Sequence, residues 1–553
     1  MTAADALPAA DEDFSGRLSP WAPLRHRIFL ALFIAQLASN IGTLMQSVGS
    51  AWLMGDLGGS PALVALVQTA TFLPVLIVGI PAGALADIVD RRKLLVATQA
   101  SMMVAAFLLT VLAFLDKVTP GSLLTLTFLL GLGTGLNGPA WQAIQPDLVP
   151  KRELSQALAL GALTFNVGRA IGPALGGLIL AALGPAWVFA VNAVSFLGTV
   201  LVLLGWRPAK LVSALPAETL TGATRAGLRY GIYSPLLRAV LLRVAVLMFP
   251  AAAIQALLPT VVRDSLGLSS GAYGLLLACF GIGAASAALV RPRLEERYTR
   301  DQLVVGSSAL LALGLIVDAL VPIAWIVGLG LYVAGTGWTT AFTTTNVSAQ
   351  SMLPQWVRAR GMGLYMLVLT GCVALGSAVW GVVADVNLVL AHLVAAGLVG
   401  VGVLAGRYYP LDATQTIDTT PVPGVDPTIV VTPRPDDGPV LVTVVHRVPP
   451  DQAADFRDTM RIIERHRRRT GAYRWNLYRD LADPDRYLES FVVDSWAEHL
   501  RQHQRTTVGA DARLDEARRF HEAGVAVTHY VSAYSPGAID LVDLELPTTT
   551  EPV

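Results

Sequence analysis

Twelve apolar stretches, each about 20 residues long, constrain this chain more than any other feature of its sequence. Only 14% of the 553 residues are charged, against roughly 25% in soluble domains, so most of the surface must face lipid. Backbone polar groups in lipid have to be satisfied within a segment, and a helix does this. We therefore expect an all-α integral membrane protein with twelve transmembrane helices, beginning near Ile28, Ala62, Leu94, Ser122, Ser155, Trp187, Leu236, Gly271, Leu303, Ile323, Gly361 and Leu388.

The loops between these stretches carry their basic residues on one side. Arg91, Arg92 and Lys93 typify that side, whereas only Lys117 and Arg263 fall on the other. Basic short loops stay in the cytoplasm, so an even number of spans and two cytoplasmic ends are predicted, in a multi-pass protein of the cell inner membrane. Residues 1–24 form the predicted N-terminal tail. The net charge of zero suggests no nucleic-acid partner.

The apolar region repeats. Pro150, Gly172 and Gly177 recur 204 residues later as Pro354, Gly376 and Gly381. Two parallel six-helix halves are predicted, residues 25–206 and 236–407, joined by a cytoplasmic loop over 207–235 that holds a short amphipathic helix. Such repeats place a binding site between the halves, near the middle of the bilayer.

The chain changes character after residue 407. Residues 408–439 are rich in Pro, Thr and Asp and are predicted to form a linker, and residues 536–553 a disordered tail. Between them, residues 440–535 are predicted to form a cytoplasmic α+β domain of ferredoxin-like fold. Its expected strands are 440–448, 473–478, 487–493 and 525–530, and its expected helices 451–468, 495–504 and 511–522.

The loop after the second stretch places Gly83, Asp87, Arg91 and Arg92 at fixed spacing. It resembles the signature loop of major facilitator superfamily transporters, although Ile88 stands where that family has its first arginine. The resemblance implies a gate: Asp87 would face the start of the eleventh helix, near Gly361, and with Arg91 and Arg92 would lock the halves together on the cytoplasmic side in the outward-open state. The alternative is that the arginines only set the orientation of the helices in the membrane, without forming a gate.

The fifth stretch resembles the antiporter motif of exporters in that superfamily, and the resemblance implies proton-driven efflux. Glycines at this spacing form one flat helix face, so plain helix packing is the alternative. Within the motif, Arg169 is a functional candidate, because a charge inside a membrane is costly. The alternative is that it forms a structural pair with a carbonyl group or with another helix. Asp318 on the ninth stretch is a candidate proton carrier, or it lies at headgroup level. The motif comprises Gly161, Gly168, Arg169, Gly172, Pro173, Gly176 and Gly177.

Polar residues form stripes at helical spacing on the first, fourth, seventh and tenth stretches. In the superfamily these four helices line the central cavity, and amides do not face lipid when a cavity is available. The alternative is hydrogen bonding between helices. A cavity with amides and aromatic rings but few charges suits a lipophilic small molecule. The predicted cavity residues are Gln36, Asn40, Thr43, Asn137, Trp141, Gln145, Gln255, Thr343 and Asn346.

The C-terminal domain resembles the dimeric α/β-barrel fold of antibiotic-biosynthesis monooxygenases. Trp475, Asn476, His499 and His503 are candidates for a cofactor-free cleft. The two histidines are also spaced for a metal, but no third ligand is evident, so no metal is predicted. The plainer interpretation is a solvated helix on an association domain. The resemblance implies a homodimer formed through this domain.

Taken over nearly the whole chain, the resemblance is to the drug and siderophore exporter branch of the superfamily (enterobactin-exporter-like), often called transmembrane secretion effectors. It implies a secondary active efflux transporter that works by alternating access, coupled to protons. A lipophilic substrate, protons and membrane lipid are the expected partners, and no cofactor is expected. A membrane-tethered enzyme or sensor, with its activity in the C-terminal domain, is the alternative. The chain has no Gly-x4-Gly-Lys-Ser/Thr motif for ATP.

Overall fold

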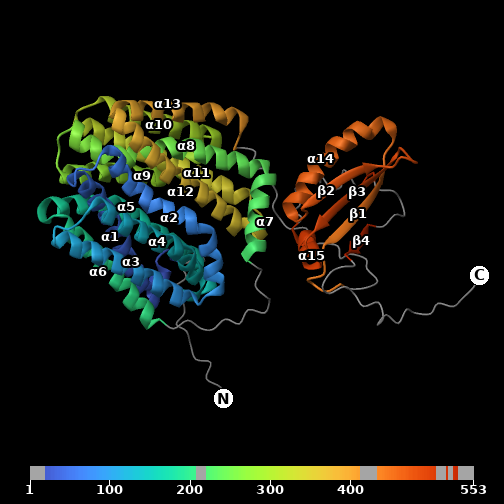
Figure 1. The fold of residues 1–553 in the computed structure, drawn as a ribbon, viewed down its shortest axis with the longest axis horizontal. Coiled ribbons are helices and arrows are strands. Elements are labelled where there is room, and N and C mark those ends of the chain that lie inside the picture. The colour runs from blue at the N-terminus through green and yellow to red at the C-terminus, as the bar shows by residue number, and fades with distance from the viewer. Residues whose placement is uncertain (1–18, 207–219, 412–432, 506–518, 521–526, 533–553) are drawn as a thin grey trace, which may run out of the picture. The chain divides into compact units, whose positions relative to one another are not determined.

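The computed structural model describes residues 19–206, 220–411, 433–505, 519–520 and 527–532. Contacts divide the chain into two compact units. The first unit is helical and comprises Met1–Leu220, Ala239–Ser348 and Tyr365–Asp412. The second comprises Thr221–Arg238, Ala349–Leu364 and Ala413–Val553, and it contains the sheet (Figure 1). The two units are described separately.

The first group of helices runs from α1 to α6, drawn in blue to green in Figure 1. Proline begins α2, α4 and α6, where a missing N–H costs nothing. The side chain of Asp90 caps α3 by accepting from the Lys93 N–H at 3.1 Å. A short turn, η1 (Ala22–Arg25), precedes the group, whose helices are α1 (Arg27–Asp56), α2 (Pro61–Ile88), α3 (Arg91–Phe114), α4 (Pro120–Leu148), α5 (Leu154–Leu183) and α6 (Pro185–Gly205).

The second group of helices runs from α8 to α13, after the short α7 (Leu220–Tyr233). Its members are α8 (Pro235–Thr260), α9 (Ser270–Glu295), α10 (Arg300–Leu320), α11 (Ala324–Met352), α12 (Gln355–Val386) and α13 (Leu388–Tyr408). A π-helical turn, η3 (Val261–Ser265), extends α8. The start of α4 at Pro120 and of α11 at Ala324 reproduces the 204-residue offset between the two halves of the sequence.

Ten helices within the described residues are long and apolar enough to cross a membrane: α1 to α6, α8 with η3, α9, α10 and α12. A multi-span membrane protein is therefore confirmed. The other two predicted stretches coincide with α11 and α13, which are not among the ten. Eight threonines and serines lower the hydropathy of α11. Twelve spans stay a prediction.

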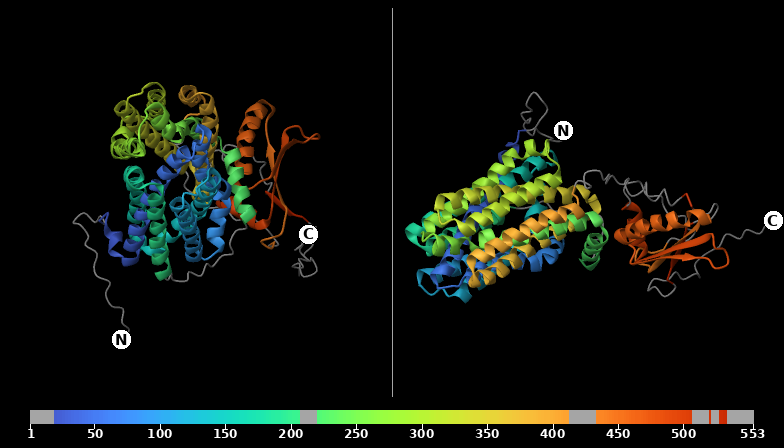
Figure 2. Two further views of the ribbon diagram at one scale, coloured as in Figure 1. Left: turned by 60° about the vertical axis from the view of Figure 1, so that its left-hand side comes forward. Right: turned by 90° about the horizontal axis from the view of Figure 1, so that it is seen from above.

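Burial in the first unit follows the expectation for helices in lipid. Helices α1 and α5, α2 and α4, α3 and α6, and α10 and α13 pack in pairs, lying lengthwise beside one another (Figure 2). Apolar clusters fill the interior, for instance Phe29, Leu95 and Ile144. Outward-facing positions are also apolar, and Leu289 is 79% exposed. A surface with this chemistry is stable in a membrane and not in water.

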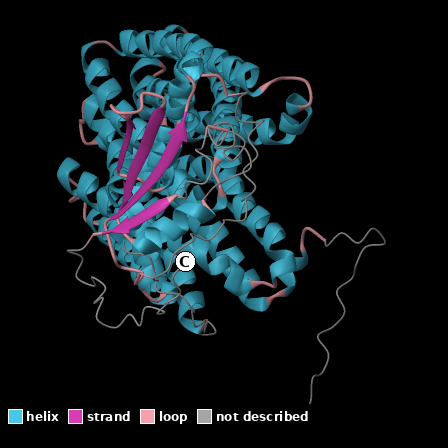
Figure 3. Cartoon of the chain, turned by 90° about the vertical axis from the view of Figure 1, so that its right-hand side faces the viewer, coloured by secondary structure: helices cyan, strands magenta, loops and turns pink. Residues whose placement is uncertain are grey.

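The second unit contains a four-stranded antiparallel sheet, visible in Figure 3. Its strands are β1 (Val440–Arg447), β2 (Arg474–Arg479), β3 (Arg486–Val493) and β4 (Thr528–Val531), in the spatial order β2-β3-β1-β4. β1 pairs with β3 so that Val440 lies opposite Val493, and β4 pairs along the other side of β1. The predicted strands are confirmed to within two residues at each end, except that β4 begins three residues later than expected.

Two helices cover one face of this sheet. α14 (Ala453–Thr470) buries Phe456, Met460 and Ile463, the apolar face that its sequence predicted. α15 (Trp496–Gln504) is capped by Ser495, whose side chain accepts from the Glu498 N–H at 3.3 Å. The helix predicted over 511–522 falls almost wholly outside the described residues.

Candidate functional site

The amide residues of α1 take part in hydrogen bonds between helices. Gln36 Nε2 donates to Asn40 Oδ1 at 3.1 Å, and Asn40 Nδ2 donates to Thr164 Oγ1 of α5 at 3.0 Å. Both amides are only partly buried, while Thr43 is exposed. The interhelical alternative therefore applies to Asn40, although Gln36 Oε1 is buried with no hydrogen-bond partner among the described residues.

The amides of α4 differ from one another. Asn137 Oδ1 accepts from Thr98 and Gln99 of α3, each at 3.3 Å, so it also joins two helices. Gln145 is buried, and its Oε1 has no hydrogen-bond partner in the described part of the chain. Trp141 packs against the apolar cluster around Leu95 and Ile144.

In the second group of helices, Gln255 of α8 reaches the first group. Its Oε1 accepts from Gln68 Nε2 of α2 at 3.5 Å. Thr343 donates to the Thr339 carbonyl one turn back in α11, at 2.6 Å, and Asn346 is partly buried. Cavity lining by these residues stays a prediction.

One buried polar pair was not predicted from the sequence. Asn192 Nδ2 of α6 donates to Gln46 Oε1 of α1, and both side chains are almost fully buried. Gln46 lies three residues after Thr43, the last cavity residue predicted on α1, and Asn192 is the single amide of α6. A lone amide in an apolar stretch was the available signal, because such a group needs a partner inside the membrane.

The glycines of the antiporter motif bring α5 against α1. A Cβ on Gly172 would lie 2.9 Å from Leu44 Cβ, and one on Gly176 would lie 2.8 Å from Met45 Cα. Gly168 meets the backbone of α1 in the same way. The flat face predicted from the spacing is confirmed for these three positions. Gly161 has nothing within 4 Å, and α5 continues as a helix through Pro173.

Gly177 and Arg169 face α9, in the second group of helices. A Cβ on Gly177 would lie 2.6 Å from Gly274 Cα, so the two helix backbones touch there. The carbonyl oxygen of Arg169 would meet a Cβ placed on Gly281, and the Arg169 guanidinium lies over the Phe165 ring at 5.2 Å. α5 therefore joins the two helical groups.

Further contacts between the two groups lie at the end of the bundle where α1 passes into α2, called here the α1–α2 end. Asp56 pairs with Arg263 at 2.5 Å, and Arg263 also lies over the Trp52 ring. Trp52 stacks on Tyr273 of α9 at 5.9 Å. Asp385 of α12 accepts from the N–H of Ala62 at 2.8 Å, at the start of α2. The α1–α2 end is thus closed in this structure.

The predicted gate lies at the opposite end, where α2 passes into α3. α2 includes both Gly83 and Asp87, but the surroundings of Gly83 and the side chain of Asp87 are not among the described parts of the structure. Arg91 lies 3.7 Å from Asp147 of α4. Arg92 Nε donates to the Leu203 carbonyl at the end of α6, at 2.8 Å. In this conformation both arginines contact the first group of helices.

Ionisable side chains are also buried within the second group. Asp318 of α10 is 5% exposed, and neither carboxyl oxygen has a hydrogen-bond partner among the described residues. His392 of α13, also fully buried, contacts the Leu388 carbonyl through Nδ1 at 2.9 Å. Arg243 of α8, which the sequence analysis did not single out, pairs with Asp301 at 2.7 Å.

The face of the sheet under α14 carries an ionic network. Glu489 Oε1 accepts from Arg467 at 3.1 Å and from Trp475 Nε1 at 3.0 Å, and His446 lies 3.7 Å away. Burial raises the pKa of Glu489, but the charge of Arg467 and these hydrogen bonds outweigh burial and lower the pKa to about 2. Asn476 follows Trp475 in β2 and points to the opposite face, so the two do not share a cleft.

Within the second unit, α15 contacts α7 and the start of α12. Glu498 pairs with Arg229 of α7 at 3.2 Å and also with Arg505, whose guanidinium lies over the Trp356 ring at 4.6 Å. Arg229 Nη1 donates to the Gly471 carbonyl at 2.8 Å. Burial lowers the pKa of Arg229, and Glu498 opposes that shift. The amphipathic helix predicted around Arg229 is confirmed as α7.

The fold is that of multi-span membrane transporters. Among solved structures, the nucleoside transporter NupG matches with a TM-score of 0.54 and 15% identity, over 70% of this chain and 99% of that chain. An inward-facing, unoccupied bacterial homologue of the lysosomal transporter Spinster matches with a TM-score of 0.57 and 15% identity, over 70% and 98%. At this level of identity the likeness concerns the fold alone.

The sequence comparisons identify the family. A family model described as "Transmembrane secretion effector" matches residues 18–536, so the chain belongs to this family of major facilitator superfamily transporters. The enterobactin exporter EntS of Shigella boydii serotype 4 is 30% identical over 364 residues, which cover 64% of this chain and 85% of that protein. The enterobactin exporter of Salmonella typhi matches with the same identity and coverage. The predicted family is confirmed.

Proposed function

We propose that this protein is a secondary active exporter of a lipophilic small molecule, a drug, macrolide or siderophore. It spans the inner membrane twelve times as two six-helix halves, α1–α6 and α8–α13, with both ends in the cytoplasm. The family match over residues 18–536 carries the proposal. The relation to enterobactin exporters supports the direction of transport.

Two buried amide oxygens support a binding role for the polar stripes. Gln36 Oε1 of α1 and Gln145 Oε1 of α4 have no hydrogen-bond partner among the described residues. An unsatisfied buried acceptor costs about 1–3 kcal/mol, and a ligand donor or a water removes that cost. The substrate pathway therefore runs beside these amides, with Asn40, Asn137 and Asn346 as further polar contacts.

The closed α1–α2 end supports alternating access. The distribution of loop charges places this end outside the cell, so the pathway opens toward the cytoplasm in this conformation. In the opposite state the contacts of Asp56 with Arg263 and of Gly177 with Gly274 separate. The cytoplasmic gate of Asp87, Arg91 and Arg92 against the start of α12 then forms.

Asp318 is the proposed proton carrier. Its carboxyl group is buried without a hydrogen-bond partner among the described residues, and an isolated charge at that depth costs several kcal/mol. Protonation of Asp318 removes the cost of burying its charge, so proton binding is coupled to a change in the environment of this side chain. His392 is also buried, on α13, which packs against α10.

The C-terminal domain has a ferredoxin-like fold and serves association. The face of its sheet away from α14 and α15 exposes Tyr478, Leu488 and Tyr530, with exposed fractions of 53%, 36% and 52%. A homodimer formed through this face buries those side chains. Sizing of the purified full-length protein in detergent tests the dimer, and a monomer would count against it.

Transport is tested in proteoliposomes that contain the purified protein and an inside-acid gradient. A lipophilic dye or drug moves against its gradient in the wild type, and Asp318→Asn stops that movement. Asp436→Asn, an exposed carboxylate in the segment before β1, is the matched control and leaves transport unchanged. Movement that does not depend on the gradient, or that Asp318→Asn does not affect, contradicts proton-coupled export.

A further inference from the structure

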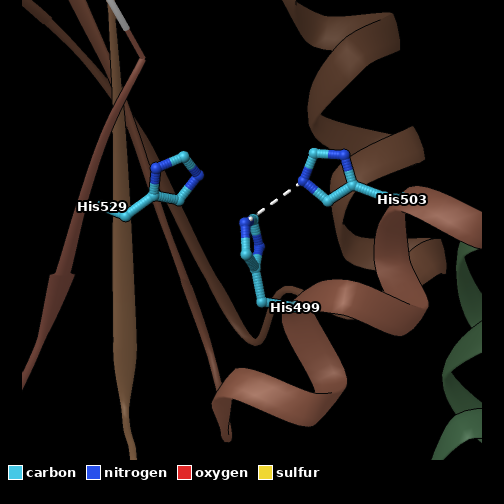
Figure 4. Close-up of side chains that lie close together, drawn as sticks. All are labelled: His499, His503 and His529. Atoms are coloured by element: carbon cyan, nitrogen blue, oxygen red, sulfur yellow. Dashed lines mark hydrogen bonds between the residues drawn. The ribbon is translucent and has the colours of Figure 1, made fainter. Parts of the chain in front are cut away.

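Three histidines from two elements meet on the helix-covered side of the sheet in the second unit. His499 and His503 lie one turn apart on α15, and His529 lies on the edge strand β4 (Figure 4). One ring nitrogen from each residue lies within 4.8 Å of those of the other two. We propose that these imidazoles bind one late first-row divalent cation, with Zn²⁺ as the occupant.

The spacing fits an ion of that size. His499 Nε2 and His503 Nε2 are 3.2 Å apart and share a hydrogen bond, whose proton a bound ion would replace. Two nitrogen ligands in a tetrahedral zinc site, each at about 2.0–2.1 Å from the ion, are about 3.3 Å apart. The first pair is therefore already at ligand separation. His529 has to approach by about 1.5 Å, which a side-chain rotation on a four-residue edge strand supplies.

The hydrogen bonds around the cluster leave a ring nitrogen available to a metal. His529 Nε2 is buried and has no hydrogen-bond partner among the described residues. The His499 side chain is 1% exposed, and Trp496 covers both it and His529, with ring centroids 5.4 Å and 6.0 Å away. A buried imidazole nitrogen without a partner costs about 1–3 kcal/mol, and coordination removes that cost.

The donor set selects the kind of ion. Three neutral imidazoles suit zinc, copper, nickel and iron, whereas magnesium and calcium require oxygen ligands. Imidazole binds such ions in its neutral form. Three protein ligands leave one tetrahedral position open for water or for an exogenous nitrogen or oxygen donor.

The site joins α15 to the strand β4. α15 has only nine residues, and within the described residues β4 pairs with β1 alone, at the edge of the sheet. A shared ion therefore fixes a short helix and an edge strand to each other, and the free energy of metal binding adds to the stability of the domain.

The test uses full-length protein in detergent, purified with a tag that contains no histidine and then stripped with a chelator. Zn²⁺ is added and quantified by mass spectrometry, and Co²⁺ serves as an optical probe of tetrahedral coordination. We expect one equivalent per chain, and a loss of affinity of at least about 100-fold in both His503→Gln and His529→Gln. His26→Gln, which changes a half-exposed histidine before α1, is the control and binds as the wild type does.

Less than a fifth of an equivalent in the wild type overturns the proposal, and so does unchanged affinity in either ligand variant. If a variant does not fold, as judged by circular dichroism and gel filtration, X-ray absorption of the zinc-loaded wild type decides. A first shell of nitrogen at about 2.0–2.1 Å with imidazole scattering supports the site, and a spectrum without imidazole scattering refutes it.

Discussion

Adding one methyl group at Gly177 is expected to move the protein between its two transport conformations. A Cβ at this position would lie 2.6 Å from Gly274 Cα and 3.0 Å from Gly274 N and from the Ser270 carbonyl oxygen. All three are backbone atoms of α9, so no side chain is able to rotate away, and α5 and α9 have to separate. Overpacking of this kind costs about 1–3 kcal/mol.

The cost falls on one conformation only. α5 belongs to the first group of helices and α9 to the second, and under the proposed alternating access their contact near the α1–α2 end opens in the outward-facing state. Gly177→Ala therefore raises the free energy of the present conformation and shifts the equilibrium toward the outward-open one by about 5- to 150-fold.

Two other glycines of α5 provide matched controls. Gly161→Ala introduces the same methyl group where nothing lies within 4 Å, so neither conformation changes. Gly172→Ala meets Leu44 and Ile41 of α1. That contact stays within the first group of helices, so both conformations lose stability equally. We expect Gly172→Ala to lower the Tm without shifting the equilibrium.

The assay measures a distance across the α1–α2 end. Spin labels replace Lys117, between α3 and α4, and Ile323, between α10 and α11, in a background without Cys279 and Cys372. Gly177→Ala should enlarge the long-distance population, whereas the two control variants keep the wild-type distribution. An unchanged distribution in Gly177→Ala, or an equal shift in Gly161→Ala, would refute the reasoning.

Three further perturbations have defined outcomes. Asp318→Asn should abolish proton release on substrate binding, measured with a pH dye in weakly buffered detergent, and release that persists rules this carboxyl out as the carrier. Arg263→Gln should favour opening of the α1–α2 end by about 0.2–1 kcal/mol, because the pair with Asp56 is partly exposed, and the spin-label distances report it. The pKa of Glu489 is lowered from 4.5 to about 2, so ionised Glu489 adds about 3 kcal/mol to the free energy of unfolding. This contribution is complete above pH 4.5 and is lost as the pH falls toward 2. Trp475 fluorescence should follow this loss, and Glu489→Gln should remove the pH dependence in that window; an unchanged acid transition would contradict it.

Much of the architecture was predictable because it depends on local patterns. The start of each of the twelve predicted apolar stretches lies within a few residues of the start of a helix, except that α12 starts six residues before Gly361. The alternation of Val440 to Val448 and the spacing of Phe456, Met460 and Ile463 gave the strand and the helix of the tail. The flat face of Gly168, Gly172 and Gly176 follows from helical geometry alone. These features need only the periods of a helix and a strand.

The pairing of side chains from distant segments depended on the tertiary structure. The stripe on α1 predicted Asn40 but not its partner Thr164, and missed the neighbouring pair of Gln46 and Asn192. His499 and His503 are visible as a one-turn repeat, but His529 follows 26 residues later and joins them only because β4 pairs with β1.

The sequence by itself determined the kind of molecule: a chain of lipid-facing helices with a repeated half, a signature loop and a soluble α+β tail. The tertiary structure decided which end of the bundle is closed, that Gly177 faces the second group of helices, and that a third histidine completes a cluster. The physical reason is that hydrophobic periodicity acts over neighbouring residues, whereas a closed gate or a ligand set is a distance between residues far apart in the chain.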